Sequence, residues 1–417
     1  MNANALTRRI LIGLVLGLAT GYAINALAAS PAQAKEIAGY LSIVTDVFLR
    51  LIKMIIAPLV LSTLIVGVAH MGSGETVGRM FGRTLGWFIG ASLISLSLGL
   101  VMVNLLHPGV GVGLELPGAD ASAGIATKAF DLKEFISHIV PKSIIEAMAT
   151  NEILQIVVFS LFAGIALLGM GEGAGPLLRG LDALMHMMLR ITGYVMQVAP
   201  FAVFAAIASA IAVEGLGILW TFAAFIGSFY LALALLWALL IVAGGSIIGF
   251  GNVRRLIVGV REPFLITFAT ASSEAAYPKL LEALDKQGIP GRIASFVLPL
   301  GYSFNLDGSM MYCAFASLFI AQAYGIDLSL GQQIAMLLLL MVTSKGIAGV
   351  PRASLVVVAA TLPYFNIPEA GLLLILAVDH FLDMGRSATN VIGNAIATAV
   401  IAKWEGAAPA AAVAQPA

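Results

Sequence analysis

Long apolar segments, separated by shorter polar ones, follow one another along most of the 417-residue chain. Each is about as long as a helix that crosses the hydrocarbon core of a bilayer, roughly 20 residues. In the first 250 residues these segments lie at about 10–27, 41–70, 82–106, 152–170, 180–213 and 216–249. An amphipathic stretch at 131–150 predicts a helix at the membrane interface. The pattern therefore predicts an all-α polytopic membrane protein.

The first apolar segment has two interpretations. Arg8 and Arg9 precede it and the small residues of Pro31–Ala34 follow it, as in a secretory signal with a cleavage site. Its apolar run is longer than the roughly 7–15 residues of a signal's hydrophobic region. We therefore interpret residues 10–27 as a retained first membrane helix.

The last third of the chain has a different pattern, in which polar residues interrupt the apolar runs. Neither half of residues 254–289 is long enough to span, and Ala271–Glu274 lies between the halves. This predicts a re-entrant helical hairpin with a polar tip. The next apolar run, 291–323, is interrupted at Gly301–Ser309 by residues that favour an unwound segment. Transporters use the backbone carbonyls of such segments to bind cations.

The same pattern then repeats. Residues 329–365 are two apolar halves around a second polar tip at 343–352, and a long polar-striped helix is expected at 369–403. A hairpin followed by a broken helix, twice over, is typical of an internal repeat around a binding site at the middle of the membrane. The alternative, ordinary loops at 301–309 and 343–352 between short spans, fits the segment lengths poorly.

Five polar residues lie on one stripe of that last helix. Their steps of four, three, four and four place on one face Asp379, Asp383, Arg386, Asn390 and Asn394. Placing a charged side chain in the middle of a membrane costs about 3 kcal/mol or more of free energy. The stripe therefore indicates a structural or functional role. One interpretation is a structural Asp383–Arg386 pair that holds helices together. The other is a ligand site with an acid for an ammonium, a guanidinium for a carboxylate, and amides for orientation or ion binding.

Composition narrows the class of protein. The chain is 60% hydrophobic and 11% charged, against roughly 25% charged in a soluble domain. Its formal net charge of zero gives no indication of nucleic-acid binding. Cys313 is the only cysteine, which excludes an intramolecular disulfide and a cysteine metal cluster. The sequence has no Gly-x-x-x-x-Gly-Lys-Ser/Thr loop, so an ATP-driven pump is not indicated.

Basic residues near the ends of the spans predict the orientation. Seven fall on one side of the membrane: Arg8, Arg9, Arg79, Arg83, Arg254, Arg255 and Lys403. Four fall on the other side: Lys35, Lys128, Lys133 and Lys142. Because cytoplasmic loops carry the excess of Lys and Arg, we expect both termini in the cytoplasm.

Four motifs, in order, resemble those of the dicarboxylate/amino acid:cation symporter family, which includes the glutamate transporters. They are Arg50-Leu-Ile-Lys-Met-Ile-Ile-Ala-Pro-Leu59, Asn305-Leu-Asp-Gly-Ser309, Ala348-Gly-Val-Pro351 and Asp383-Met-Gly-Arg386. The resemblance extends over nearly the whole chain. It is greatest to the bacterial proton-coupled glutamate/aspartate and C4-dicarboxylate carriers.

The resemblance implies a fold and an assembly. The family has eight transmembrane helices and two re-entrant hairpins, and it forms homotrimers in the inner (plasma) membrane. Residues 1–250 are then mainly scaffold and trimerisation helices, although the third and sixth can move with the transport core. Residues 251–403 are the transport core: first hairpin, seventh helix, second hairpin and eighth helix. The core carries substrate by an elevator-like displacement, and 404–417 is expected to be a disordered tail.

The resemblance also assigns roles at the site. It implies that Asp383 holds a substrate ammonium and Arg386 a substrate carboxylate. The other implied substrate-binding positions are Ser272, Ser273, Ser309, Gly349, Val350, Ser387 and Asn390. The implied cation-binding positions are Gly301, Ser303, Asn305, Asp307, Ser344, Asn390 and Asn394. A sodium ion, where one binds, is expected at Asn305, Asp307 and Asn390.

The chain departs from sodium-coupled members of this family. It has Asn394 where those members have an acidic residue, so one proposed sodium site loses its negative charge. It has Phe88 and Ala91 where a deeper site uses hydroxyl groups, although Ser92 remains. Hard cations need oxygen ligands with compensating charge, and this chain offers fewer. We therefore expect protons to replace some or all of the sodium.

Two carboxyl groups are the candidate proton carriers, Asp307 and Glu274. Burial favours the neutral form of a carboxyl group and so suits it to take up a proton. The coupling ions are then protons, sodium or both, and no other cofactor is expected.

The substrate is predicted from the same departures. Asp383 favours glutamate or aspartate, because the C4-dicarboxylate branch has no acid at this position. Glu274 resembles that branch, so succinate, fumarate or malate is the alternative. Many members carry an extra arginine where this chain has Ala271 and Met384. Arg352, at the second hairpin tip, either supplies the missing charge or faces water.

Two other classes of protein are more distant alternatives. An ion channel would need a continuous polar stripe along several helices, which the first six spans lack. An intramembrane protease could use Asp307 and Asp383 as a catalytic pair. Such a pair must share a proton, whereas Arg386 would hold Asp383 ionised. We therefore expect a transporter and not an enzyme.

Overall fold

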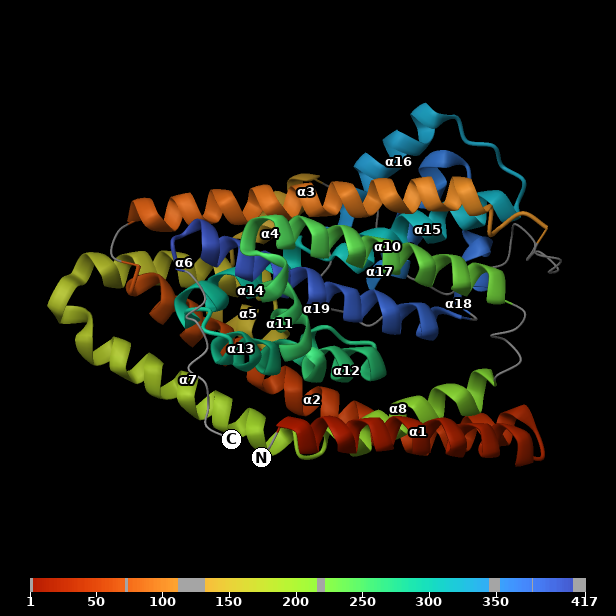
Figure 1. The fold of residues 1–417 in the computed structure, drawn as a ribbon, viewed down its shortest axis with the longest axis horizontal. Helices are drawn as coiled ribbons and strands as arrows, with labels where there is room; N and C mark the ends of the chain where they lie inside the picture. Colours follow the sequence, from red (N-terminus) through yellow and green to blue (C-terminus); the bar gives the residue numbers. More distant parts are fainter. Residues whose placement is uncertain are drawn as a thin grey trace.

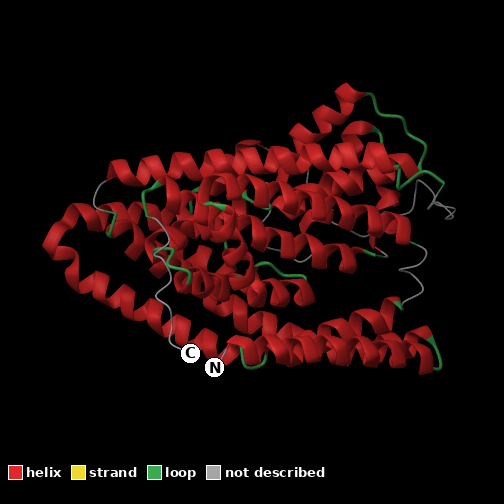
Figure 2. Cartoon of the chain, in the orientation of Figure 1, coloured by secondary structure: helices red, strands yellow, loops and turns green. Residues whose placement is uncertain are grey.

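The computed structural model describes residues 3–71, 74–111, 132–215, 222–344, 353–376 and 378–407. All regular elements of these ranges are helices, and no strand occurs among them (Figure 2). Six helical stretches in the described part are long and apolar enough, by length and composition, to cross a membrane. The predicted fold class, an all-α polytopic membrane protein, is confirmed.

The first half of the chain supplies the outer helices of the bundle (Figure 1). Their bounds are α1 Ala3–Leu27, α2 Pro31–Ala69, α3 Gly74–Leu106, α4 Leu132–Ile139, α5 Ile144–Thr150, α6 Ile153–Met170, η1 Gly171–Ala174, α7 Gly175–Val195, α8 Ala199–Glu214 and α10 Ala223–Ile248. Ser30 begins α2 with a cap, since its hydroxyl accepts a hydrogen bond from the backbone N–H of Gln33.

Three glycines allow α1 to lie against α8. Gly13, Gly17 and Gly21 follow one another at intervals of four and form a stripe along α1. A Cβ added at each would lie 2.5–2.6 Å from a backbone carbonyl oxygen of α8, at Pro200, Phe204 and Ala208 in turn. The stripe therefore permits a close backbone approach that any larger residue would prevent.

Two predicted elements of this half are wrong in their bounds. The interfacial stretch 131–150 contains two short helices, α4 and α5, separated at Pro141 and restarted by the cap Ser143. The fifth span, 180–213, is two helices, α7 and α8, with turns at 196–198. Pro200 lies in the first turn of α8, where its missing N–H is tolerated and the preceding helix has ended.

The second half begins with the predicted first hairpin. Its helices are α11 Phe250–Gly259, α12 Arg261–Thr270, η2 Glu274–Ala276 and α13 Tyr277–Lys286. Between α12 and η2 the chain reverses at Ala271, which has a left-handed backbone with φ of 52°. The predicted broken helix follows as α14 Gly291–Phe304 and α15 Asp307–Ala323, interrupted at Asn305 and Leu306.

The second hairpin and the striped helix complete the chain. Their elements are α16 Leu330–Thr343, α17 Ala353–Thr361, η4 Leu362–Phe365, η5 Glu369–Gly371, α18 Leu372–Leu376 and α19 Asp379–Trp404. The expected single helix at 369–403 is instead interrupted between α18 and α19, so that Asp379 stands in the first turn of α19. The second hairpin tip, 345–352, lies outside the described residues.

The polar-striped helix α19 runs through the middle of the bundle (Figure 1). It contacts α10, α12, α14 and α15, and almost every residue from Asp379 to Ala402 is buried. A helix buried on all sides cannot turn its polar stripe to lipid or water. The stripe therefore faces other protein groups, and these form the site.

The end of α19 is tied to the start of α3. The carboxylate of Glu405 pairs with Arg79 at 2.9 Å and with Arg83 at 2.8 Å. The rings of Trp404 and Trp87 also meet edge to face, with centroids 5.9 Å apart. The contacts of Glu405 place it in the fold, although it lies in the segment predicted as a tail.

Candidate functional site

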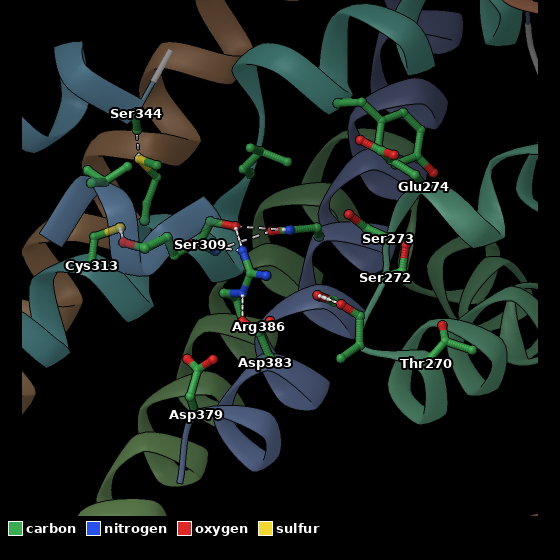
Figure 3. Close-up of a pocket in the computed structure, with 18 of the residues that line it drawn as sticks. Thr270, Ser272, Ser273, Glu274, Ser309, Cys313, Ser344, Asp379, Asp383 and Arg386 are labelled. Atoms are coloured by element: carbon green, nitrogen blue, oxygen red, sulfur yellow. Dashed lines mark hydrogen bonds and ion pairs between the residues drawn. The ribbon is translucent and has the colours of Figure 1, made fainter. Parts of the chain in front are cut away.

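A cavity of about 260 Å³ lies between the first hairpin tip, the break of α14–α15, the second hairpin and α19 (Figure 3). Its predicted polar lining consists of Ser272, Ser273, Glu274, Ser309, Ser344, Asp379, Asp383, Arg386, Ser387 and Asn390. Sequence segments more than one hundred residues apart thus meet around one small space. The volume is close to the lower end of the range for small-molecule sites, roughly 300 Å³.

Arg386 occupies the centre of this site. Its Nε lies 2.6 Å from Oδ1 of Asp383, one helical turn earlier on α19. Its Nη1 donates to the hydroxyl of Ser309 on α15 at 3.0 Å and to that of Ser354 on α17 at 2.7 Å. Figure 3 shows the guanidinium between Ser309 and Asp383. Both charged side chains are buried, so each needs this pairing to remain charged in a low dielectric.

Asp379 has a different partner. The phenol of Tyr312 on α15 donates to Oδ1 of Asp379 at 2.5 Å. The guanidinium carbon of Arg386 lies 5.9 Å from the centroid of the same tyrosine ring, within the range of a cation–π contact. Tyr312 therefore connects the first carboxylate of the stripe to the arginine and fixes the orientation of both.

Asn390 caps the second half of the broken helix. Its Oδ1 accepts hydrogen bonds from the backbone N–H of Gly308 at 2.9 Å and of Ser309 at 3.3 Å. Its Nδ2 donates to the hydroxyl of Ser309 at 3.2 Å. The first N–H groups of a helix have no partner within the helix, and this amide supplies one. Asn390 thus holds Ser309 in the position where it meets Arg386.

A second polar cluster lies deeper in the bundle. Nδ2 of Asn305 donates to Oδ1 of Asn394 at 3.1 Å, and both side chains are fully buried. A Cβ added at Gly301 would meet the Asn394 side chain, and one added at Gly393 would meet the carboxylate of Asp307. The two glycines therefore let α14 and α15 approach α19 closely enough to join these residues.

This cluster has the chemistry of a cation site. Oδ1 of Asn305 is buried and accepts no hydrogen bond from any described residue, and the Asp307 carboxylate is fully buried beside it in sequence. Buried amide and carboxylate oxygens suit a hard cation such as sodium. A proton on Asp307 would serve the same electrostatic purpose.

Two predicted cation ligands lie elsewhere. Ser344 lines the substrate-sized cavity, and its hydroxyl donates to the carbonyl of Met341 and approaches the sulfur of Met310. Among the described residues, no side-chain hydrogen bond joins Ser303 to the Asn305–Asn394 pair. The role of Ser303 and Ser344 in cation binding is implied by the family resemblance, and it stays a prediction.

A hydrogen bond from a side chain of α19 to the backbone of the first hairpin tip joins these two elements. The hydroxyl of Ser387 donates to the carbonyl oxygen of Ala271 at 3.1 Å. Ser272 and Ser273 follow on the cavity wall, and Glu274 lies on the same wall as Lys53 of α2 (Figure 3 labels the hairpin residues). Lys53 is thus the cation on the outer helices that shares the cavity with the Glu274 carboxylate.

Some predicted residues cannot be placed, and some site residues were not predicted. Gly349, Val350 and Arg352 lie outside the described residues. The cavity residues that the sequence did not predict include Lys53, Ser354 and His380, and Tyr312 is an unpredicted partner of Asp379 beside the cavity. Tyr312 follows Ser309 by three on one helix, and that spacing was a usable signal. Ser354 follows the second tip, and nothing in its sequence neighbourhood indicates its arginine contact.

Comparison with known proteins identifies the family. Residues 6–404 match the family described as the sodium:dicarboxylate symporter family. The chain is 40% identical over 412 residues to the proton/sodium-glutamate symport protein of Bacillus caldotenax, covering 97% of this chain and 96% of that protein. It is 38% identical over 406 residues to the protein of the same description from Bacillus subtilis, covering 96% and 93%. It is 39% identical over 367 residues to the C4-dicarboxylate transport protein of Laribacter hongkongensis, covering 87% and 83%.

Proposed function

The chain belongs to the sodium:dicarboxylate symporter family, and from that premise we propose that it imports an acidic amino acid, glutamate or aspartate, together with cations. It is a membrane symporter and not an enzyme. The observation that carries the choice of substrate is the buried ion pair of Asp383 and Arg386 on the wall of a substrate-sized cavity.

An acidic amino acid carries both charges that this pair needs. Its side-chain carboxylate would pair with the guanidinium of Arg386, and its ammonium would pair with the carboxylate of Asp383. Binding then replaces one buried ion pair by two, and no charge is left without a partner. The planar fork of arginine matches a carboxylate with two parallel hydrogen bonds. The hydroxyls of Ser272 and Ser273 remain for the α-carboxylate.

A C4-dicarboxylate is the second candidate substrate. Glu274 supports it, as does the similarity to proteins described as C4-dicarboxylate transport proteins. Such a substrate has no ammonium, so Asp383 would stay beside Arg386 and compete with the incoming carboxylate. The position of Asp383 therefore favours the amino acid. Transport of each substrate by a variant in which residue 383 is uncharged would distinguish the two candidates.

We propose that the coupling ions use the deeper cluster and the hairpin tip. Asp307, Asn305 and Asn394 would hold a sodium ion or, through Asp307, a proton, while Glu274 would carry a proton at the tip. Glutamate and aspartate carry a net charge of −1 at neutral pH. Uptake into a negative interior therefore needs at least two cations for the membrane potential to drive it.

The transport step follows the family's elevator scheme. Residues 251–403 would move against the scaffold of residues 1–250, within a homotrimer in the inner membrane and with both termini in the cytoplasm. The glycine-mediated contacts of α1 with α8 support a rigid scaffold, and the burial of α19 among α12, α14 and α15 supports a core that moves as one body.

Uptake by proteoliposomes that contain the purified protein tests the function. Labelled aspartate and labelled succinate are offered under an imposed pH gradient, an imposed sodium gradient, or neither. We expect aspartate to accumulate under the pH gradient without sodium. Accumulation of succinate alone would contradict the choice of substrate, and a strict requirement for sodium would contradict the proton coupling.

A further inference from the structure

A second and larger cavity, of about 1030 Å³, lies outside the substrate site. It is bounded by the end of α2, by α7, by the first hairpin arm α13 and by the start of α14. Its walls thus come from the scaffold on one side and from the predicted transport core on the other. The volume is at the upper end of the range for small-molecule sites, about 1,000 Å³.

The charges on this cavity wall leave an excess of positive charge. Three cationic side chains, Arg190, Arg292 and Lys279, stand against two acidic ones, Glu282 and Asp285, which leaves a net charge of +1. Lys279 pairs with Glu282 at 2.8 Å, and Lys286 pairs with the same carboxylate. His70 and His186 also line the cavity and add positive charge when protonated.

The two arginines are available to a ligand. Within the described part of the chain, no ion pair joins the guanidinium of Arg190 or of Arg292, and both residues are exposed. Arg190 comes from α7 and Arg292 from the first turn of α14, so the two helices each contribute one guanidinium group to the cavity. Gly291 lies beside Arg292 at the positive end of the α14 dipole, which adds to the attraction for an anion.

Apolar side chains also line the cavity, together with neutral polar ones such as Thr63, Thr192 and Gln197. Val66, Met185, Leu189, Met196 and Leu281 line the cavity beside the charged groups. Soluble anions such as inorganic phosphate gain nothing from such surface, whereas acyl chains do. The cavity also lies at the end of the bundle where α2 ends and α3 begins, on the side that carries Arg79 and Arg83 and is predicted to be cytoplasmic.

We propose that this cavity binds one anionic phospholipid of the cytoplasmic leaflet, with its phosphodiester between Arg190 and Arg292 and its upper acyl chains along the apolar wall. Basic pockets between membrane helices on the cytoplasmic side bind anionic headgroups in this way. One net negative charge on the lipid balances the net charge of +1 on the wall. The site joins scaffold helices to the first hairpin and is independent of the substrate assignment.

Thermal unfolding of the purified, delipidated protein in detergent tests the proposal. Phosphatidylglycerol, phosphatidylcholine and inorganic phosphate are added separately. We expect phosphatidylglycerol to raise Tm by several degrees, since a ligand that binds only the folded state stabilises it by mass action. An equal rise with phosphatidylcholine would overturn the role of charge. An equal rise with inorganic phosphate would overturn the assignment to a lipid.

Two double variants locate the effect. R190Q/R292Q removes both guanidinium groups from the cavity, and R179Q/R254Q removes two exposed arginines on the same side that do not line it. We expect the first to lose the rise in Tm with phosphatidylglycerol and the second to keep it. The same loss in both variants would mean general attraction to the surface and would overturn the site.

A fluorescent label in the cavity provides a second test of the proposal, which does not depend on whether R190Q/R292Q folds. Gly193 lines the cavity and has open space where a Cβ would be added, so Gly193→Cys is tolerated sterically and can carry a fluorophore. Cys313 is buried and does not compete for the label. We expect brominated phosphatidylglycerol to quench the label more strongly than brominated phosphatidylcholine. Equal quenching would overturn the proposal.

Discussion

Asn390 and Ser309 form a reciprocal contact across the centre of the site. The Asn390 amide accepts from the backbone N–H of Ser309 and donates to its hydroxyl, at 3.3 and 3.2 Å. The same hydroxyl accepts a hydrogen bond from Arg386 at 3.0 Å. One asparagine therefore caps the start of α15 and holds the hydroxyl that accepts the hydrogen bond from Arg386, so helix capping is connected to the proposed substrate site.

Asn390→Ala should weaken both the fold and the site. The change leaves the N–H groups of Gly308 and Ser309 without their acceptor, which costs about 1–3 kcal/mol in a buried setting. We expect a lower Tm and a weaker apparent affinity for aspartate, measured by thermal unfolding and uptake. Asn104→Ala, which removes an exposed amide contact with Gln333, is the control and should change neither. An unchanged affinity for aspartate in Asn390→Ala would show that capping of α15 by Asn390 does not affect substrate binding.

Arg386→Lys should reduce the affinity for every dicarboxylate substrate. Lysine keeps the charge but loses the fork that reaches Asp383, Ser309 and Ser354 at once. The loss of charge-assisted hydrogen bonds of about 1.5–3 kcal/mol corresponds to roughly a 10- to 100-fold increase in Kd. Binding of labelled aspartate and succinate to the purified protein measures it. Arg83→Lys, in the first part of α3 and outside the cavity, is the control. Wild-type affinity would show that the guanidinium does not bind substrate.

Asp383→Asn should separate the two candidate substrates. The neutral amide cannot pair with an ammonium but no longer competes for Arg386. We expect aspartate uptake to fall by about 100-fold, the effect of losing a charged partner worth about 3 kcal/mol. Succinate uptake should be kept or rise. A parallel loss of both substrates would mean that Asp383 only holds Arg386 in place.

Glu274→Gln should remove part of the pH dependence of transport. If a proton on Glu274 accompanies substrate, KM for aspartate in the wild type rises as the pH rises and the carboxyl ionises. The glutamine imitates the protonated form, so KM should stay low and change little with pH. Glu172→Gln, an exposed acid of η1, should keep the wild-type profile. An unchanged profile in Glu274→Gln would exclude this proton carrier.

Gly393→Ala should disturb the deeper cluster. The added methyl group would meet the carboxylate of Asp307, and overpacking of this kind costs about 1–3 kcal/mol. We expect a lower Tm together with a changed dependence of uptake on sodium and pH. Gly227→Ala on α10, where a Cβ meets open space, is the matched control. Loss of stability without any change in coupling would separate Asp307 from the ion site.

The sequence predicts the site residues that follow one another along a single element. It does not predict the contacts between residues of separate helices. The stripe from Asp379 to Asn394 follows helical spacing, so its face could be predicted without a structure. At the reversal near Ala271 and at the break near Asn305, polar residues interrupt apolar runs of the sequence. These interruptions made both positions predictable. The contact of Ser354 with Arg386, and the meeting of Gly393 with Asp307, depend on how separate helices pack.

The wrong boundaries have local physical reasons that hydropathy does not resolve. Pro200 ends one helix and begins another within a single apolar segment, and averaging over the segment conceals the turn. The interruption before Asp379 has no proline or glycine to mark it. There Asp379, in the first turn of α19, accepts a buried hydrogen bond from Tyr312 of another helix, a tertiary contact that the local sequence does not show. In both cases a tertiary or single-residue effect overrides the average pattern.

The glycine stripe of α1 limits how α1 and α8 can move relative to each other. A shift of α1 along α8 by one residue would bring Leu14, Leu18 and Tyr22 to the positions of Gly13, Gly17 and Gly21, against the same carbonyl oxygens. Only registers that keep a glycine opposite each carbonyl oxygen are therefore permitted, and α1 cannot slide along α8 in small steps. The close packing of these glycines thus fixes the relative position of α1 and α8 without a covalent bond.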